Sequence, residues 1–454
     1  MNLQPSLTRQ LLTQLHRRPI TAQDRKRAAL HVLDWISCVS LGKNSEVGKV
    51  FQQFVDDEVI DSNRMATNLF SGYVHWRQAL TVNAALGNVL EMDDIHRSSI
   101  LHPGPVVIPT ALALAERCDS SMEVFLDAVI WGYEITIRLG ESIGRSHYKF
   151  FHNTATCATF GAALAASKIL DLSVQKSVWA LGNTGSQTGG LWQMRNEKVQ
   201  TKQWHNSQAA LAGANAALLA NKGLSGPEYI LEGPQGVLTA MSQDAEPEKF
   251  LEISENWRMY DCSFKPWPAC RHAHPAIDVI SQTLITHPNI KANNIISVEI
   301  HTYNDAVVFC DRPTPETELQ AKFSIQHAVS ALLLWGEPEL QHYRESHINN
   351  EQIALMREKV KVLVDDDIEA DYPFHYGAKC VMSLISGERI ELYHQDTLGD
   401  PERPMSKQQI DDKAHKLMGE SGIPADTIKT LCSLEWADSS ALHDLTKLLG
   451  KGSK

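Results

Sequence analysis

The strongest constraint on the fold comes from two segments made mostly of alanine and glycine. They cover residues 157–170 (CATFGAALAASKIL) and residues 205–222 (HNSQAALAGANAALLANK). Small side chains let the backbones of neighbouring helices approach closely, so these segments predict a tightly packed helical core. Both runs are short and carry charge, which argues against a membrane span of about 18 apolar residues.

Helical periodicity extends over much of the chain, but its character changes in the second half. Residues 20–42, with Thr21 as a candidate cap, and residues 78–90 and 122–144 also predict helices. After residues 265–268 (KPWP), the runs 295–302, 360–364 and 379–385 predict strands, and residues 386–393 predict the turn and second strand of a hairpin. Helical patterns at 277–286 and 323–334 lie among them, and the tail from Ser406 is helical again.

These patterns predict a mainly α protein with a large all-helical domain and a smaller α+β domain. We expect the helical domain to begin with residues 1–264. We expect the α+β domain at 265–404, and helices at 405–454 that return to the helical domain.

The charge and cysteine content limit the classes of partner. A formal net charge of −12 argues against a nucleic-acid partner, which would need a basic face. The eight cysteines are scattered without a CxxC pair, as in a reduced, cytoplasmic protein. Residues 1–19 lack the apolar core of a secretory signal; they resemble a mitochondrial presequence only faintly, and a first surface helix is favoured.

The richest group of titratable residues is the stretch 91–96 (EMDDIH), followed by His102-Pro103-Gly104-Pro105 and a buried helical pattern at 106–116. Pro105 suits the first turn of that helix. A loop that runs into a helix N-terminus offers free N–H groups to a carboxylate ligand. The stretch therefore predicts an acid/base site for an anionic substrate. The alternative is a polar turn in which Asp93 or Asp94 only caps a helix.

Two other segments place histidines in a similar position. His152 precedes one alanine-rich segment, and Thr201-Lys202-Gln203-Trp204-His205 opens the other, so His102, His152 and His205 each stand just before a small-residue helix. Lys202 and His205 are three residues apart and share a helix face. Together these groups predict a basic, partly desolvated pocket for a polyanion, with histidine suited to proton transfer. Singly, each lysine or histidine is more typical of a solvated or capping group.

The proline-rich segment 265–274 (KPWPACRHAH) lies at the expected domain boundary. Lys265 and Arg271 could bind a carboxylate there, although a rigid linker explains the prolines equally well. The glycine-rich segment 182–190 lacks the lysine-serine ending of a phosphate loop and favours a helix break beside the pocket.

A metal site is an alternative for the first stretch. Asp93, Asp94, His96 and His102 are residue types that bind Zn or Fe, which would suit a metal-dependent hydrolase. Their spacing matches neither HExxH nor another sharp metal motif, and the chain has no GxSxG elbow. We therefore expect no metal at this stretch.

A series of motifs, in the same order along nearly the whole chain, resembles the MmgE/PrpD family. They are EMDDIHRSSILHPGP, FHNTATCATFGAALAASK, KQWHNSQAA, GLSGPEYILEGPQG, KPWPACRHAHPAID, FSIQH and GDPERPM. Each motif is weak alone, and together they are specific. That family contains 2-methylcitrate dehydratase, cis-aconitate decarboxylase and iminodisuccinate epimerase.

The resemblance implies a homodimer in which the α+β domain is a lid. It also implies cofactor-free proton chemistry on a small di- or tricarboxylate, in a cleft between the domains. Position by position it implies a site that contains Asp93, His102, His152, Lys202 and Lys265, with His327 where the family often has tyrosine. Our candidate catalytic residues are Asp93, His102, His152 and Lys202, and our candidate substrate-binding residues are His96, His205, Lys265, Arg271 and His327.

Several expected pocket positions depart from the family pattern, namely Glu91, Ile95, Asn206, Ser207, Trp267, Gln326 and His327. Dehydration, decarboxylation and epimerisation therefore stay open. A member that has lost catalysis and acts by binding is a further alternative.

Overall fold

In the computed structural model, residues 4–57, 64–197, 199–438 and 442–451 are described. The chain forms two compact units. Unit 1 contains Met1–Val89, Asp93–Cys262 and Ser406–Lys454, and unit 2 contains Leu90–Met92 and Ser263–Met405. The contacts thus assign residues 90–92 to unit 2, inside the range that we expected to be helical domain.

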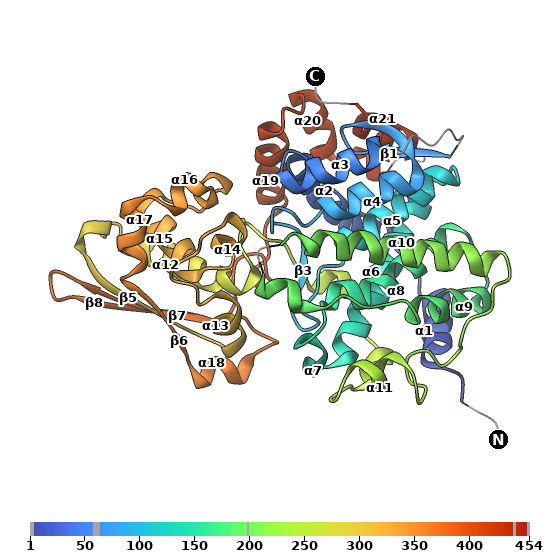
Figure 1. The fold of residues 1–454 in the computed structure, drawn as a ribbon, viewed down its shortest axis with the longest axis horizontal. Helices are drawn as coiled ribbons and strands as arrows, with labels where there is room; N and C mark the ends of the chain where they lie inside the picture. Colours follow the sequence, from blue (N-terminus) through green and yellow to red (C-terminus); the bar gives the residue numbers. More distant parts are fainter. Residues whose placement is uncertain (1–3, 58–63, 198, 439–441, 452–454) are drawn as a thin grey trace. The chain divides into compact units, whose positions relative to one another are not determined.

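Unit 1 is helical, as predicted (Figure 1). Its longer helices are α1 (Leu7–Arg17), α2 (Ala22–Gly42), α3 (Glu46–Asp56), α4 (Trp76–Leu86), α5 (Gly104–Arg117), α6 (Met122–Ile143), α8 (Asn153–Ile169), α9 (Val174–Gly185), α10 (Thr201–Asn221), α19 (Lys407–Glu420), α20 (Ala425–Ser433) and α21 (Leu442–Leu449). The short elements are β1 (Met65–Asn68), β2 (Gly72–His75), β3 (Ile95–His96), α7 (Arg145–Tyr148) and α11 (Val237–Met241). None of the described helices is both long and apolar enough to cross a bilayer.

Helix α8 lies at the centre of this unit and packs on α5, α6, α9 and α10. The small residues make this packing possible. A Cβ at Gly161 of α8 would lie 2.8 Å from the Gly132 carbonyl oxygen of α6, and one at Gly213 of α10 would lie 2.6 Å from the Thr159 carbonyl oxygen of α8. Backbones therefore meet directly, as the alanine- and glycine-rich segments predicted.

Unit 2 is the smaller α+β part that the sequence predicted. Its sheet has the order β6-β5-β7-β8, with β5 (Ile295–Thr302) parallel to β6 (Val360–Val364) and antiparallel to β7 (Ala378–Leu384), which pairs antiparallel with β8 (Arg389–His394). Helices α12 (His274–Thr286) and α15 (Ile325–Trp335) contact this sheet and each other. The remaining helices are α13 (Asn304–Cys310), α14 (Glu318–Lys322), α16 (Glu345–Ile348), α17 (Glu351–Arg357) and α18 (Asp366–Asp371).

A buried ion pair joins the C-terminal part of unit 1 to its N-terminal part. Lys413 Nζ of α19 lies 2.6 Å from Asp34 Oδ1 of α2, and both side chains are buried. Burial raises the pKa of Asp34 to about 6, although the ammonium of Lys413 opposes that rise. Removing one partner would therefore leave a costly buried charge.

We predict that Lys413→Met lowers the free energy of unfolding by about 3–5 kcal/mol at pH 7.5, because Asp34 loses its partner. The double variant D34L/K413M should be clearly more stable than K413M, since it removes both charges. Urea titrations of the three proteins measure this. A loss below about 1 kcal/mol in K413M, or an equal loss in the double variant, would contradict it.

Candidate active site

Six of the predicted site residues lie in unit 1, on segments that its central helices hold in place. They are Asp93, His96 and His102 on the loop before α5, His152 directly before α8, and Lys202 and His205 on α10. Lys265, Arg271 and His327 lie in unit 2.

Asp94 is the best-connected carboxylate of the loop. Its Oδ2 accepts hydrogen bonds from His31 Nδ1 at 2.6 Å and from the Tyr133 hydroxyl at 2.7 Å, and its Oδ1 accepts one from the Gly104 N–H at 3.3 Å. Burial acts to raise the pKa of Asp94, but these donors outweigh it and hold the pKa below its usual value. Asp94 therefore caps the start of α5 and ties the loop to α2 and α6.

Asp93 faces different partners. Its Oδ1 accepts a hydrogen bond from Asn88 Nδ2 at 2.5 Å, and its Oδ2 lies 2.9 Å from His102 Nδ1. The same Nδ1 lies 2.9 Å from the Asp94 carbonyl oxygen. Both neighbours are acceptors, so Nδ1 must carry a proton, and Nε2 is the ring nitrogen that can give or take one. The structural alternative, a carboxylate at the helix start, thus applies to Asp94, and an acid/base role of Asp93 stays a prediction.

The His102 loop is also attached to the next helix. The backbone N–H of His102 donates to Thr154 Oγ1 of α8 at 3.0 Å. The His102 side chain is 12% exposed, whereas that of Asp93 is 1% exposed. His102 is therefore partly accessible to solvent, whereas Asp93 is not.

His152 and His205 form a second pair. Their Nδ1 atoms are 3.3 Å apart, so one ring must donate and the other accept. Burial, with Lys202 and His205 nearby, holds the pKa of His152 well below its usual value. Burial and Lys202 also lower the pKa of His205. Both rings are therefore uncharged near neutral pH.

The start of α10 corrects one expectation. The helix begins at Thr201, so His205 lies inside it, one turn after the buried Lys202, and not just before it. Only Trp204 among residues 201–204 is apolar, so this first turn shows no hydrophobic periodicity. Two helix N-termini therefore carry predicted histidines, at His102 and His152, while Lys202 and His205 share one face of α10.

The glycine-rich segment lies beside this pair, as the sequence indicated. The Gly190 carbonyl oxygen accepts the His152 N–H at 2.8 Å, and Gly190 has a φ of +109°. A Cβ at Gly190 would lie 3.4 Å from His205 Nδ1 and 2.7 Å from Ala155 Cβ. A larger residue would be strained there and would press on the histidines.

His96 has a structural environment. It is 2% exposed, its Nδ1 lies 2.9 Å from Ser99 Oγ, and its backbone N–H donates to the Leu101 carbonyl at 2.9 Å. Burial lowers its pKa to about 3. His96 thus shapes the loop as an uncharged residue, and a role in substrate binding stays a prediction.

The three candidates in unit 2 are all buried and engaged there. Lys265 Nζ lies 3.6 Å from Glu91 Oε2, a residue with a φ of +56°, and Arg271 pairs with Asp400. His327 Nε2 donates to the His342 carbonyl oxygen at 2.8 Å, and burial lowers the pKa of His327 to about 4. Their contact with a substrate remains a prediction from the resemblance.

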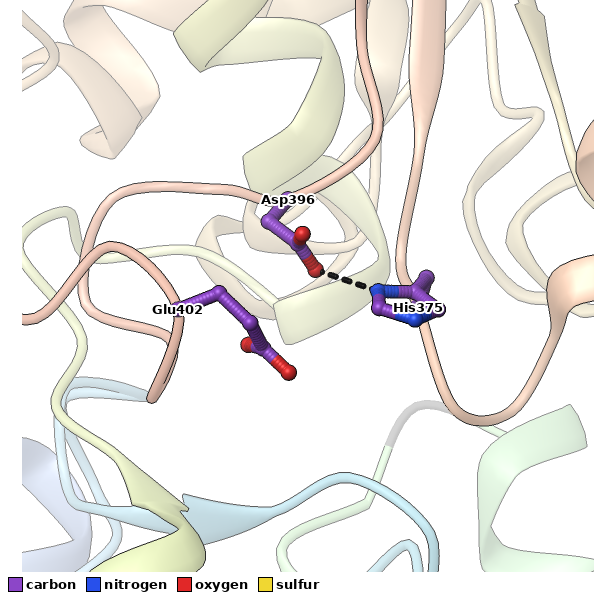
Figure 2. Close-up of side chains that lie close together, drawn as sticks. All are labelled: His375, Asp396 and Glu402. Atoms are coloured by element: carbon purple, nitrogen blue, oxygen red, sulfur yellow. Dashed lines mark hydrogen bonds and ion pairs between the residues drawn. The ribbon is translucent and has the colours of Figure 1, made fainter.

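The residues weighed as an alternative metal site, Asp93, Asp94, His96 and His102, do not form a ligand group among the described residues. The group found there, with donor atoms within 4.8 Å of one another, is His375, Asp396 and Glu402 of unit 2. Figure 2 shows the three side chains pointing toward one another from neighbouring loops. A hydrogen bond of 2.7 Å between His375 Nδ1 and Asp396 Oδ1 accounts for that pair, and Glu402 is exposed.

Sequence reasoning missed the residues that hold the two aspartates. His31 on α2 and Tyr133 on α6 bind Asp94, and Asn88 binds Asp93. A polar residue within an apolar helical pattern is the only local hint for His31 and Tyr133. Pairing across 63 and 39 residues leaves no local pattern.

We predict that His96→Gln reduces the loss in the free energy of unfolding that the wild type shows as the pH falls below neutral. The folded-state pKa of about 3 lies below the unfolded value near 6.5, so the unfolded chain binds the proton first and His96 costs stability as the pH falls. The cost is about 2 kcal/mol at pH 5. Urea titrations between pH 7 and 4.5 measure it, with the exposed His443→Gln as control. Equal slopes in wild type and H96Q would contradict it.

Comparisons with known proteins cover most of the chain. The model of the MmgE/PrpD N-terminal domain matches residues 10–249, and that of the MmgE/PrpD C-terminal domain matches residues 267–432. A human cis-aconitate decarboxylase is 26% identical, with 97% of this chain and 95% of the relative covered. Its mouse counterpart is 26% identical over 93% and 88%, and the cis-aconitate decarboxylase-like protein oryM of Aspergillus oryzae is 24% identical over 89% and 88%. The chain therefore belongs to the MmgE/PrpD family.

Proposed function

We propose that this protein is a lyase that moves a proton next to a carboxylate of a small di- or tricarboxylate. The observation that carries the proposal is the contact of His102 Nδ1 with Asp93 Oδ2 and with the Asp94 carbonyl, each at 2.9 Å. It orients Nε2 as the proton-transferring atom. Asp93 can then balance the charge of the imidazolium whenever His102 holds a second proton.

The surroundings of His102 favour an anionic substrate. Lys202 is buried beside two uncharged histidines, in a chain whose net charge is −12. A buried ammonium attracts a carboxylate strongly because little water screens it. The same ammonium would stabilise the electron pair that forms on the carbon next to that carboxylate.

The relatives make decarboxylation of cis-aconitate the first candidate, because two are named cis-aconitate decarboxylase and a third is named as similar to it. In that reaction a C–C bond breaks, carbon dioxide leaves and the electron pair remains on carbon. The imidazolium of His102 would supply the proton that this carbon takes up. Dehydration and epimerisation would use the same groups, with loss of hydroxide or with proton return on the opposite face.

The resemblance extends the proposal. It assigns Lys265 and His327 to the site, and we add Arg271 as a candidate partner of a substrate carboxylate. A homodimer, a cytoplasmic location and independence of cofactors also remain predictions. Uncharged His152, next to His205, would serve as a hydrogen-bond partner or as a second base.

We predict that the protein exchanges a carbon-bound proton of at least one small polycarboxylate with solvent. Proton NMR in deuterated water with cis-aconitate, 2-methylcitrate, citrate and iminodisuccinate would detect both turnover and exchange. His102→Ala should lower the rate by about 10²–10⁴-fold with unchanged circular dichroism. His443→Ala, at an exposed position, is the matched control.

Wild-type protein that neither converts nor labels any of these compounds would favour the binding-only alternative. Equal rates for wild type and H102A would remove His102 from the chemistry. The same assay after dialysis against EDTA tests the metal-dependent alternative. Loss of activity that Zn²⁺ or Fe²⁺ restores would support that alternative, and full activity would contradict it.

A further inference from the structure

A group of positively charged side chains surrounds Trp76, the first residue of α4 in unit 1. Arg77 Cζ lies 4.5 Å and Arg117 Cζ lies 5.1 Å from the centroid of the Trp76 ring. Arg117 is the last residue of α5, which packs on α4 (Figure 1). Arg77 Nη2 also donates to Asn215 Oδ1 at 3.2 Å, and Asn215 lies about 20 Å along α10 from Lys202. The group is therefore distinct from the candidate active site.

Within the described parts of the chain, neither Arg77 nor Arg117 forms an ion pair. Burial lowers the pKa of Arg117, and the positive charges of Arg64 and Arg77 lower it further. Stacking on the Trp76 ring helps to hold the two guanidinium groups, but it leaves their charge unbalanced. The local field is thus positive, in a chain whose net charge is −12.

The carboxylate next to Arg117 in the chain, that of Glu116, has other partners. Its Oε2 accepts the Thr67 N–H at 2.9 Å, and its Oε1 accepts the Thr67 hydroxyl at 2.6 Å. Burial raises the pKa of Glu116 to about 7, so this carboxyl group is partly protonated near neutral pH. Glu116 therefore does not balance the charge of Arg117.

Three buried polar atoms of the group have no hydrogen-bond partner among the described residues. They are Arg117 Nη1, Trp76 Nε1 and His75 Nδ1. The side chains of Trp76 and His75 are both buried. Burial and the neighbouring arginines lower the pKa of His75, so its ring is uncharged near neutral pH. A buried polar atom without a partner costs free energy that hydrogen bonds to a ligand would recover.

The start of α4 adds to the attraction for an anion. Its N-cap residue is His75, whose side chain makes no capping hydrogen bond. The helix is 11 residues long, so its N-terminus carries the positive end of a helix dipole. Helix N-termini of this kind favour phosphate and other anions, and here the arginines on α4 and α5 act in the same direction.

A simpler explanation covers part of this arrangement. Arg117 stands at the C-terminus of α5, where a cation is stabilised by the helix dipole, and Arg77 is exposed and can be solvated. That explanation accounts neither for the buried Nη1 of Arg117 nor for the buried Nδ1 of His75, which both lack a partner among the described residues. An anion bound between the arginines and the start of α4 accounts for both.

We propose that Arg77 and Arg117, together with the start of α4, bind a phosphate group on the surface of unit 1. A phosphate group carries about two negative charges near pH 7.5 and so matches two guanidinium groups, whereas a single carboxylate would balance only one. Guanidinium groups also match the oxygen atoms of phosphate in geometry. Arg77 is exposed, so the group is open to solvent. The proposal does not depend on the reaction at His102.

Isothermal titration calorimetry of the full chain at pH 7.5, in a phosphate-free buffer, tests the proposal. Orthophosphate and AMP are titrated separately, and at least one should bind saturably with a Kd below about 10 mM. Binding of orthophosphate alone would identify free phosphate as the ligand, and AMP that binds equally or more tightly would identify a phosphorylated organic molecule. Arg77→Gln and Arg117→Gln should each weaken binding at least about tenfold with unchanged circular dichroism, because each removes a charge-assisted contact.

Two control variants make the test specific. Arg389→Gln changes an exposed arginine of unit 2 that pairs with Glu391, and its affinity should stay within about twofold of wild type. Lys202→Gln should likewise bind as wild type, since Lys202 belongs to the candidate active site. No saturable binding below about 10 mM, unchanged affinity in the double variant R77Q/R117Q, or a loss of binding in K202Q would overturn the proposal.

Discussion

The candidate active site depends on the different partners of two adjacent carboxylates, Asp93 and Asp94. Asp94 binds His31, Tyr133 and the N–H of Gly104, and thereby joins α2, α5 and α6 around one buried carboxylate. Its neighbour is then free to face His102. If Asp93 also pointed toward α2 and α6, His102 would lack a charged partner. If Asp94 also pointed toward His102, the Gly104 N–H at the start of α5 would lose its acceptor.

The helical core makes this arrangement rigid. Close contact of α8 with α6 and α10, at Gly161 and Gly213, leaves no room for one helix to shift alone. The loops are fastened to the same core, through the His102 N–H to Thr154 and the His152 N–H to Gly190. Groups that must hold a proton at a defined atom gain from such support, because small displacements cost large factors in rate.

Much of the fold follows from local patterns. The β-branched run at 295–302 and the hairpin near residues 386–393 form the strands β5, β7 and β8, and Thr21 caps α2 with a capping box. Small residues indicated the contact faces of α8 and α10. By contrast, hydrophobic periodicity does not show that α10 begins at Thr201, because the first residues of the helix carry no periodic apolar signal.

The sequence alone could propose the residues of the candidate site, but it could not give the contacts that each of them makes. The sequence around Asp93 and Asp94 does not show which of them binds the interior, because the choice depends on His31 and Tyr133, which lie 63 and 39 residues from Asp94 in the chain. The low pKa values of His96 and His152 depend on burial, which only the fold defines. The family resemblance supplied the order of the motifs, and the structure added which hydrogen bonds each one makes.

A double-mutant cycle on Asp93 and His102 tests most directly whether the two act as one acid/base unit. The rate of deuterium incorporation into the substrate would be measured for D93N, H102A and D93N/H102A. If Asp93 works through His102, the double variant should be no slower than H102A alone, within about twofold. Losses that multiply would show that the two residues act independently, and would contradict the role assigned to their contact.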